Sequence, residues 1–176
     1  MSFFEKKYLP ELFLFILAVA LYANTLRHGF VFDDQIVLTQ NSFVKRGIAG
    51  LPDIFAHHSF AGYARLAEQQ NSLPGGRYRP LSLAIFAIFH DVFGENSTVF
   101  HGFSILLYAL TGVLLYRLLR CLLKGATGAN RTAWLAAILF VAHPVHTEVV
   151  ANVKSCDEQL ALLLGMGAWM AVFHAF

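Results

Sequence analysis

Four apolar segments, separated by more polar stretches, divide the chain. Each approaches the length of about 20 residues that a helix needs to cross a bilayer. We predict membrane helices at about residues 9–26, 99–120, 132–152 and 157–176. The longest interval between them, residues 27–98, is predicted to be an extracytoplasmic loop. The pattern thus predicts an all-α polytopic membrane protein with one transmembrane domain and a long first loop.

A shorter apolar segment lies inside this loop, and we place a helix there at residues 80–93. Its length would be about 20 Å at a rise of about 1.5 Å per residue, too short for about 30 Å of hydrocarbon. A crossing here would also put the basic cluster between residues 117 and 131 outside, against the positive-inside rule. We therefore predict a juxtamembrane helix packed at the interface.

The first apolar segment follows Lys6 and Lys7, which places the N-terminus in the cytoplasm. The alternative is a cleaved signal peptide, since the start is basic and the apolar core is short. The triplet Leu21-Tyr22-Ala23 argues against it, because Leu21 is bulky at a position where cleavage prefers a small residue. We favour a retained helix, which puts the loop after it on the extracytoplasmic face.

Composition agrees with a membrane location. Only 14% of the 176 residues are charged and 57% are hydrophobic, whereas soluble domains carry about 25% charged residues. The lipid bilayer is therefore an expected partner. A net charge of +2 without an aromatic-interleaved basic patch excludes nucleic acid as a partner. The chain stops in an apolar run at residues 171–176 without a cap or breaker, so we expect an incomplete domain: a truncated product or a piece of a longer polytopic protein.

The most informative polar pair is Asp33-Asp34, which follows the first apolar segment and the aromatic residues Phe30 and Phe32. Acidic residues at a bilayer edge cost free energy unless they are solvated, paired or bound to a cation or substrate. Such carboxylates can act as a general base or hold a divalent metal ion. The alternative is a turn or a helix cap, where aspartate is common.

Two further clusters are candidates for substrate binding. Arg77 and Arg79 precede the interfacial helix and would suit an anionic phosphate, or else anchor to lipid headgroups. Pro144 lies in a polar block that contains His143, His146 and Glu148. We expect this proline to kink the third helix, so that Glu148 turns towards the face of the two histidines. They form either a polar site facing the same cavity as the acidic pair or a helix end that reaches water.

Three stretches together resemble one family. Residues 22–26 running into 29–34, the block Arg79-Pro80-Leu81, and the block at 140–153 are similar to the transmembrane and tetratricopeptide-repeat O-mannosyltransferase-like family. That family belongs to the GT-C class of glycosyltransferases. The resemblance covers nearly the whole chain and matches the N-terminal part of the family.

The resemblance implies transfer of a sugar from a polyprenyl-phosphate donor to a protein or glycan acceptor on the extracytoplasmic face. Asp33 and Asp34 would supply the catalytic base or ligate a divalent metal ion, and Arg79, His143, His146 and Glu148 match the later motifs. The further helices and the tetratricopeptide domain of the family are absent, so we expect this chain to be inactive alone. The alternative is a non-catalytic membrane scaffold or a transporter fragment.

Overall fold

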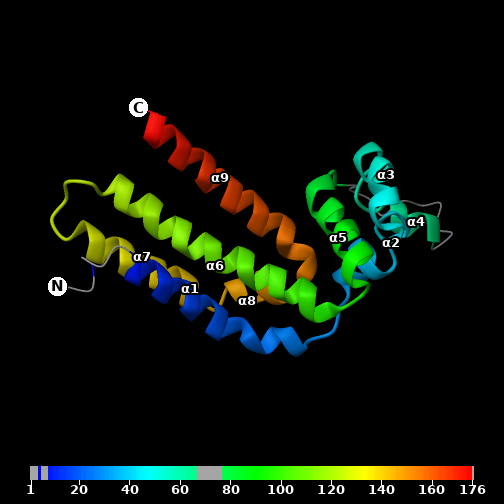
Figure 1. The fold of residues 1–176 in the computed structure, drawn as a ribbon, viewed down its shortest axis with the longest axis horizontal. Coiled ribbons are helices and arrows are strands. Elements are labelled where there is room, and N and C mark those ends of the chain that lie inside the picture. Colours follow the sequence, from blue (N-terminus) through cyan, green and yellow to red (C-terminus); the bar gives the residue numbers. More distant parts are fainter. Residues whose placement is uncertain (1–3, 5–7, 67–76, 176) are drawn as a thin grey trace. The chain divides into compact units, whose positions relative to one another are not determined.

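The structure is a computed structural model that describes residues 4, 8–66 and 77–175. It divides into two compact units, which we describe separately. Unit 1 comprises Met1–Asn24, Phe103–Ala151 and Glu158–Phe176, and unit 2 comprises Thr25–Gly102 and Asn152–Asp157. Figure 1 shows the path of the chain through its helices. Lys6 and Lys7, on which the predicted orientation rests, lie outside the described residues.

Unit 1 is built from long apolar helices. Helix α1 spans Leu9–Tyr22 and carries Pro10 in its first turn, where the missing N–H interrupts no helical hydrogen bond. The 3-10 helix η2 (Ala23–Arg27) continues it. The other helices are α6 (Ser97–Leu122), α7 (Ala129–Ala142), α8 (His146–Ala151) and α9 (Cys156–Ala175), with the first residues of α6 and of α9 belonging to unit 2.

The core of unit 1 forms where α1, α6 and α7 meet. Leu14 of α1 and Tyr116 of α6 pack against Ala133 and Ala137 of α7, and all four are buried. The two alanines allow helix backbones to approach closely, as small residues do between membrane helices. Arg117 joins α6 to α1 through two hydrogen bonds to the Glu11 carboxylate, of 3.0 and 2.8 Å.

The helix that we predicted at 132–152 is two helices in the structure. Helix α7 ends at Ala142, and α8 begins at His146. The residue between Ala142 and Pro144, His143, has extended backbone angles (φ −72°, ψ 126°). Proline disfavours helical angles in the residue before it, and it has no N–H to donate. The Pro144 kink is therefore a full break in the helix.

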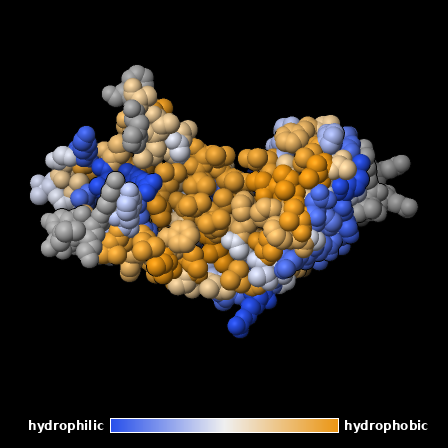
Figure 2. Space-filling view, viewed as in Figure 1, coloured by the Kyte–Doolittle hydropathy of each residue, from blue (hydrophilic) through white to orange (hydrophobic). Residues whose placement is uncertain are grey.

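Within the described residues, three helical segments are long and apolar enough to cross a membrane by length and composition: Leu9–Arg27, Ser97–Leu122 and Val153–Phe173. Shorter apolar helices span Gly47–Ala56, Pro80–Phe93 and Ala129–Ala142. Figure 2 shows hydrophobic residues over much of the visible face of the unit 1 helices. No strand occurs in the described part of the chain. The prediction of an all-α integral membrane protein is confirmed.

Unit 2 holds most of the first loop as a set of short helices around α5 (Pro80–Phe93). In chain order these are the π-helix η3 (Gln35–Thr39), α2 (Ser42–Lys45), η4 (Gly47–Gly50), α3 (Leu51–Ala56), α4 (Ala61–Leu66) and, after α8, η5 (Val153–Ser155). Helix α5 packs against η3, η4, α2 and α3. The helix predicted at 80–93 has the bounds of α5, and its place at the membrane interface stays a prediction.

A cluster of aromatic rings joins α5 to the start of α6 within unit 2. Phe100 is completely buried. Its ring lies 5.5 Å from that of Phe30, 5.9 Å from Phe86 and 5.7 Å from Phe89, measured between centroids. These separations are typical of favourable edge-to-face and tilted pairs. The cluster therefore fixes the position of the Phe30 ring, shortly before the acidic pair in the sequence.

Asn41 organises the short helices that precede α5. Its buried side-chain oxygen caps α2 by accepting from the N–H groups of Phe43 (3.1 Å) and Val44 (3.4 Å). Its amide nitrogen donates to the carbonyl oxygens of Ile36 (3.3 Å) and Ser59 (3.1 Å). One side chain therefore satisfies four backbone groups that short helices leave without partners.

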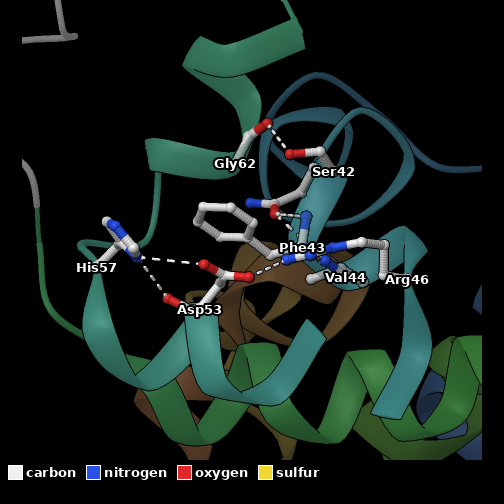
Figure 3. Close-up of polar contacts among 8 residues, drawn as sticks. Ser42, Phe43, Val44, Arg46, Asp53, His57 and Gly62 are labelled. Atoms are coloured by element: carbon white, nitrogen blue, oxygen red, sulfur yellow. Dashed lines mark hydrogen bonds and ion pairs between the residues drawn. The ribbon is translucent and has the colours of Figure 1, made fainter. Parts of the chain in front are cut away.

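Surface contacts complete this frame (Figure 3). The Ser42 hydroxyl donates to the Gly62 carbonyl at 2.8 Å, and the Arg46 guanidinium pairs with the Asp53 carboxylate. The ring of His57 lies 3.0 Å from the Asp53 carbonyl oxygen through its Nδ1. These contacts tie α4 to α2 and the end of α2 to α3.

Candidate functional site

The acidic pair lies in a tight turn that closes on itself. The Asp34 N–H donates to the Val31 carbonyl at 2.7 Å, and the Val31 N–H donates to Asp34 Oδ2 at 3.1 Å. The π-helix η3 begins directly after Asp34. Phe30 is held by the aromatic cluster on one side of this turn. The local sequence therefore presents both carboxylates from a fixed backbone.

Asp34 is the buried member of the pair. Its side chain is 0% exposed, and Oδ1 accepts from the Lys154 N–H at 2.8 Å. Lys154 belongs to η5, which Asn152 caps through its side-chain oxygen at 3.2 Å. Burial raises the pKa of the Asp34 carboxyl above its usual value, although the two backbone donors oppose that shift. Asp34 thus joins the first loop to a segment 120 residues later.

Asp33 is the accessible member of the pair. Its side chain is 54% exposed, and Oδ2 lies 3.7 Å from the Lys154 ammonium group. The two neighbouring carboxylates therefore contact the same lysine, one through its backbone and the other through its side chain. Asp33 keeps oxygen atoms open to solvent, whereas both oxygens of Asp34 accept backbone hydrogen bonds.

Phe32 has an unusual backbone next to this pair. It is the one residue other than glycine with a positive φ (20°) in the part of the chain that the structure describes. Its side chain is 90% exposed. A bulky residue in such a conformation carries strain, and local strain of this kind is common at functional sites.

The two arginines lie beside the same segment. The Ser59 N–H donates to the Arg77 carbonyl at 2.8 Å, and the Arg79 N–H donates to the Ser59 hydroxyl at 3.1 Å. The Arg79 guanidinium pairs with the carboxylate of Asp157. Arg77 and Arg79 line a small pocket together with Lys154 and Asp157. The structure therefore brings Asp33, Asp34 and the arginines together through residues 154–157.

The pocket itself is nearly filled. Its volume is about 10 Å³, which accommodates about one water molecule. A sugar phosphate does not fit within it in this conformation. A donor would have to bind over its rim or displace the contact between Arg79 and Asp157.

A metal site was one prediction for the acidic pair. Among the described residues, no group of three or more His, Cys, Asp or Glu side chains is arranged to hold a metal ion. Divalent cations such as Ca²⁺ take six or more oxygen ligands. Because both oxygens of Asp34 already accept hydrogen bonds, these residues do not fit a metal ion, and we derive no step that uses one.

The third predicted cluster, His143, His146 and Glu148, belongs to unit 1. That it faces the same cavity as the acidic pair stays a prediction. His143 accepts from the Val145 N–H at 3.2 Å within the break after α7. The His146 ring lies 4.3 Å from the ring of Phe140 and 5.5 Å from that of Tyr108. Glu148 is exposed on α8. The histidine rings are 6.2 Å apart but do not share one helix, because of Pro144.

Sequence reasoning did not identify Lys154, Asp157 or His101 as site residues. His101 is completely buried, and it lies close enough to Asp34 that a protonated imidazole would lower the pKa of that carboxyl. An ionisable residue within an apolar helix could have drawn attention to it. Lys154 and Asp157 gave no such signal, because they lie 120 or more residues after the acidic pair.

Comparison with known proteins gives one matching family and several similar curated proteins. The family described as dolichyl-phosphate-mannose-protein mannosyltransferase matches residues 77–175. Protein O-mannosyl-transferase TMTC1 of Mus musculus is 33% identical over 153 residues, which cover 85% of this chain and 15% of that protein. Protein O-mannosyl-transferase TMTC4 of Homo sapiens is 32% identical over 169 residues, which cover 90% of this chain and 22% of that protein.

The chain thus spans only about a fifth or less of the length of these curated relatives. No solved structure matched the chain significantly. The family match covers more than half of the chain and includes Arg77, Arg79, the block at 140–153 and Asp157. On this evidence, the chain belongs to the dolichyl-phosphate-mannose-protein mannosyltransferase family.

Proposed function

We propose that this chain is part of a membrane glycosyltransferase that transfers a sugar from a polyprenyl-phosphate donor to a protein hydroxyl on the extracytoplasmic face. The family supports this, since its description includes dolichyl-phosphate-mannose as well as protein mannosyl transfer. The relatives are likewise described as protein O-mannosyl-transferases. The basic residues after α6 support an N-terminus in the cytoplasm and the acidic pair outside.

The observation that carries the proposal is the different environment of the two carboxylates. Asp33 is exposed and lies next to the Lys154 ammonium group, so it can meet a substrate. Asp34 is buried and bound by two backbone N–H groups, so it fixes the turn that presents Asp33. We assign Asp33 as the general base and Asp34 as a positioning residue.

The reaction then follows ordinary glycosyl-transfer chemistry. The acceptor hydroxyl oxygen attacks the anomeric carbon of the donor sugar, and Asp33 takes the hydroxyl proton. The bond between the anomeric carbon and the phosphate oxygen breaks, and polyprenyl phosphate leaves with the bonding electrons. A positioned general base contributes about 10²–10⁴-fold to such a reaction.

Cationic side chains near Asp33 suit the leaving phosphate. Arg77 is exposed at the rim of the pocket, and Lys154 lies 3.7 Å from Asp33. Arg79 would be available when its pairing with Asp157 opens. Arginine presents several donors in a planar fork that matches phosphate oxygens. We propose that His143, His146 and Glu148 bind another part of the donor or acceptor.

The test is mannose transfer from dolichyl-phosphate-mannose to a protein acceptor, in membranes that contain the full-length protein. Asp33→Asn should lower the transfer rate about 100-fold or more while leaving folding unchanged. Asp91→Asn removes an exposed carboxylate of α5 elsewhere in unit 2 and serves as the matched control. Full activity of Asp33→Asn would refute the assignment of the base. Absence of transfer by the unaltered protein to any acceptor would favour the non-catalytic scaffold.

A further inference from the structure

A second cluster of cations, within unit 1, surrounds a larger pocket. Arg117 and Arg120 from the last turns of α6 and Lys124 just after it line this pocket, together with Asn130 of α7 and Met170 of α9. The pocket volume is about 410 Å³, within the range of small-molecule sites. Figure 2 shows hydrophilic residues gathered near the end of α6. None of the proposed catalytic residues contributes to this pocket.

The charges that line the pocket are only partly neutralised. Arg117 donates two hydrogen bonds to Glu11, so these two charges offset each other. Arg120 donates to the Asn130 side-chain oxygen at 3.0 Å, and its guanidinium lies 5.4 Å from the centre of the Tyr116 ring. Across the described ranges, no acidic group forms an ion pair with Arg120 or Lys124. About two positive charges are therefore left to face the pocket.

The surrounding backbone adds donors and room. The bond to Arg120 uses the Asn130 oxygen, so the amide NH₂ of that residue is a further donor. Helix α7 begins at the pocket without a side-chain cap, and helix N-termini favour anions. Gly125 and Gly128 turn the chain with φ of 94° and 77°. A side chain added at either glycine would meet no other atom within 4 Å, so the loop leaves the pocket open.

We propose that this pocket binds the phosphate group of an anionic lipid headgroup. Its two unneutralised cations match a phosphate in charge, and the pocket lies where membrane-spanning α6 ends. Met170 gives it an apolar wall, and Leu162, Trp169 and Phe173 along α9 are exposed to contact acyl chains. Basic pockets between membrane helices bind such headgroups in other proteins. The positive-inside rule would put this lipid in the cytoplasmic leaflet.

The experiment uses the whole 176-residue chain in neutral detergent, with binding followed by native mass spectrometry. Phosphatidic acid, phosphatidylcholine and inorganic phosphate are the three probes. We expect phosphatidic acid to bind in preference to phosphatidylcholine. Lys124→Gln or Arg120→Gln should weaken phosphatidic acid binding about fivefold, since each basic residue near a membrane surface contributes on that scale. Lys124→Arg should retain binding, which separates lost charge from lost folding.

Arg131→Gln is the matched control, because it removes one exposed positive charge just beyond the pocket lining. It should change binding less than twofold. Equal weakening by Arg131→Gln and Lys124→Gln would overturn the proposal, because general surface charge would then explain binding. Lack of preference for phosphatidic acid would also overturn it. Competition by millimolar inorganic phosphate would support recognition of the phosphate group alone, whereas unchanged lipid binding would support recognition of the whole headgroup.

Discussion

Replacing Asp34 with alanine tests the division of roles within the acidic pair. The carboxylate accepts hydrogen bonds from the backbone N–H groups of Val31 and Lys154, at 3.1 and 2.8 Å. A donor left without a partner costs about 1–3 kcal/mol. Both hydrogen bonds are only partly buried, so water can replace part of the loss. The Lys154 N–H also donates to the Asn152 side-chain oxygen at 3.2 Å and keeps that acceptor. Only the Val31 N–H loses its partner, so we expect Asp34→Ala to lower the free energy of unfolding by about 1–3 kcal/mol.

The matched control is Asp33→Ala, at the neighbouring carboxylate. Asp33 is 54% exposed, and its lysine partner is 3.7 Å away. Exposed ion pairs contribute about 0–1 kcal/mol, so Asp33→Ala should change the free energy of unfolding by less than about 1 kcal/mol.

Two assays in detergent measure this difference. Denaturant unfolding followed by circular dichroism reports the free energy of unfolding. Hydrogen exchange reports the protection of the Val31 amide, which should fall in Asp34→Ala and not in Asp33→Ala. Equal destabilisation by both variants, or unchanged protection of the Val31 amide in Asp34→Ala, would refute the assignment of Asp34 as the anchor of this turn.

Four further predictions follow from the same contacts. Burial raises the pKa of Asp34, so the folded state binds this proton more tightly than the unfolded state does. The free energy of unfolding, relative to that of Asp34→Asn, should therefore be greatest below the ordinary pKa of about 4 and fall as pH rises through the folded pKa. Denaturant unfolding at several pH values measures this difference. Phe32→Gly should raise the midpoint of thermal unfolding, because it removes strain at φ 20° from a side chain that is 90% exposed; a lower midpoint would show that the Phe32 ring stabilises the fold. Gly62→Ala should lower the free energy of unfolding by about 1–3 kcal/mol in the same assay, since the new Cβ would lie 2.1 Å from Asn41 Oδ1. The control is Gly29→Ala, whose new Cβ would meet nothing within 4 Å and which should be nearly neutral. A cysteine at Gln40 should react with a membrane-impermeant thiol reagent from the extracytoplasmic side, and labelling from the cytoplasm would contradict the predicted orientation.

Local pattern was sufficient to predict the helices α1, α5, α6 and α9. The length of each apolar run predicted the segments that became α1, α6 and α9, because a helix that crosses lipid must satisfy its backbone internally over about 20 residues. Pro80 and Gly94 bounded α5 for a similar local reason. Pro144 was recognised as a kink, but whether a proline bends or ends a helix depends on the contacts around it, so the break between α7 and α8 was not predictable.

The candidate site was predictable only in part. The sequence by itself determined that two adjacent carboxylates follow a membrane helix and that two arginines precede α5, because both are neighbours along the chain. Only the tertiary structure decided that Asp33 is exposed while Asp34 is buried, and that Lys154 contacts both. These are contacts over about 120 residues of separation, and they arise from the packing of η5 against the first loop. Hydropathy and motif spacing report which groups a segment carries, whereas burial and partners depend on which distant segments pack around them.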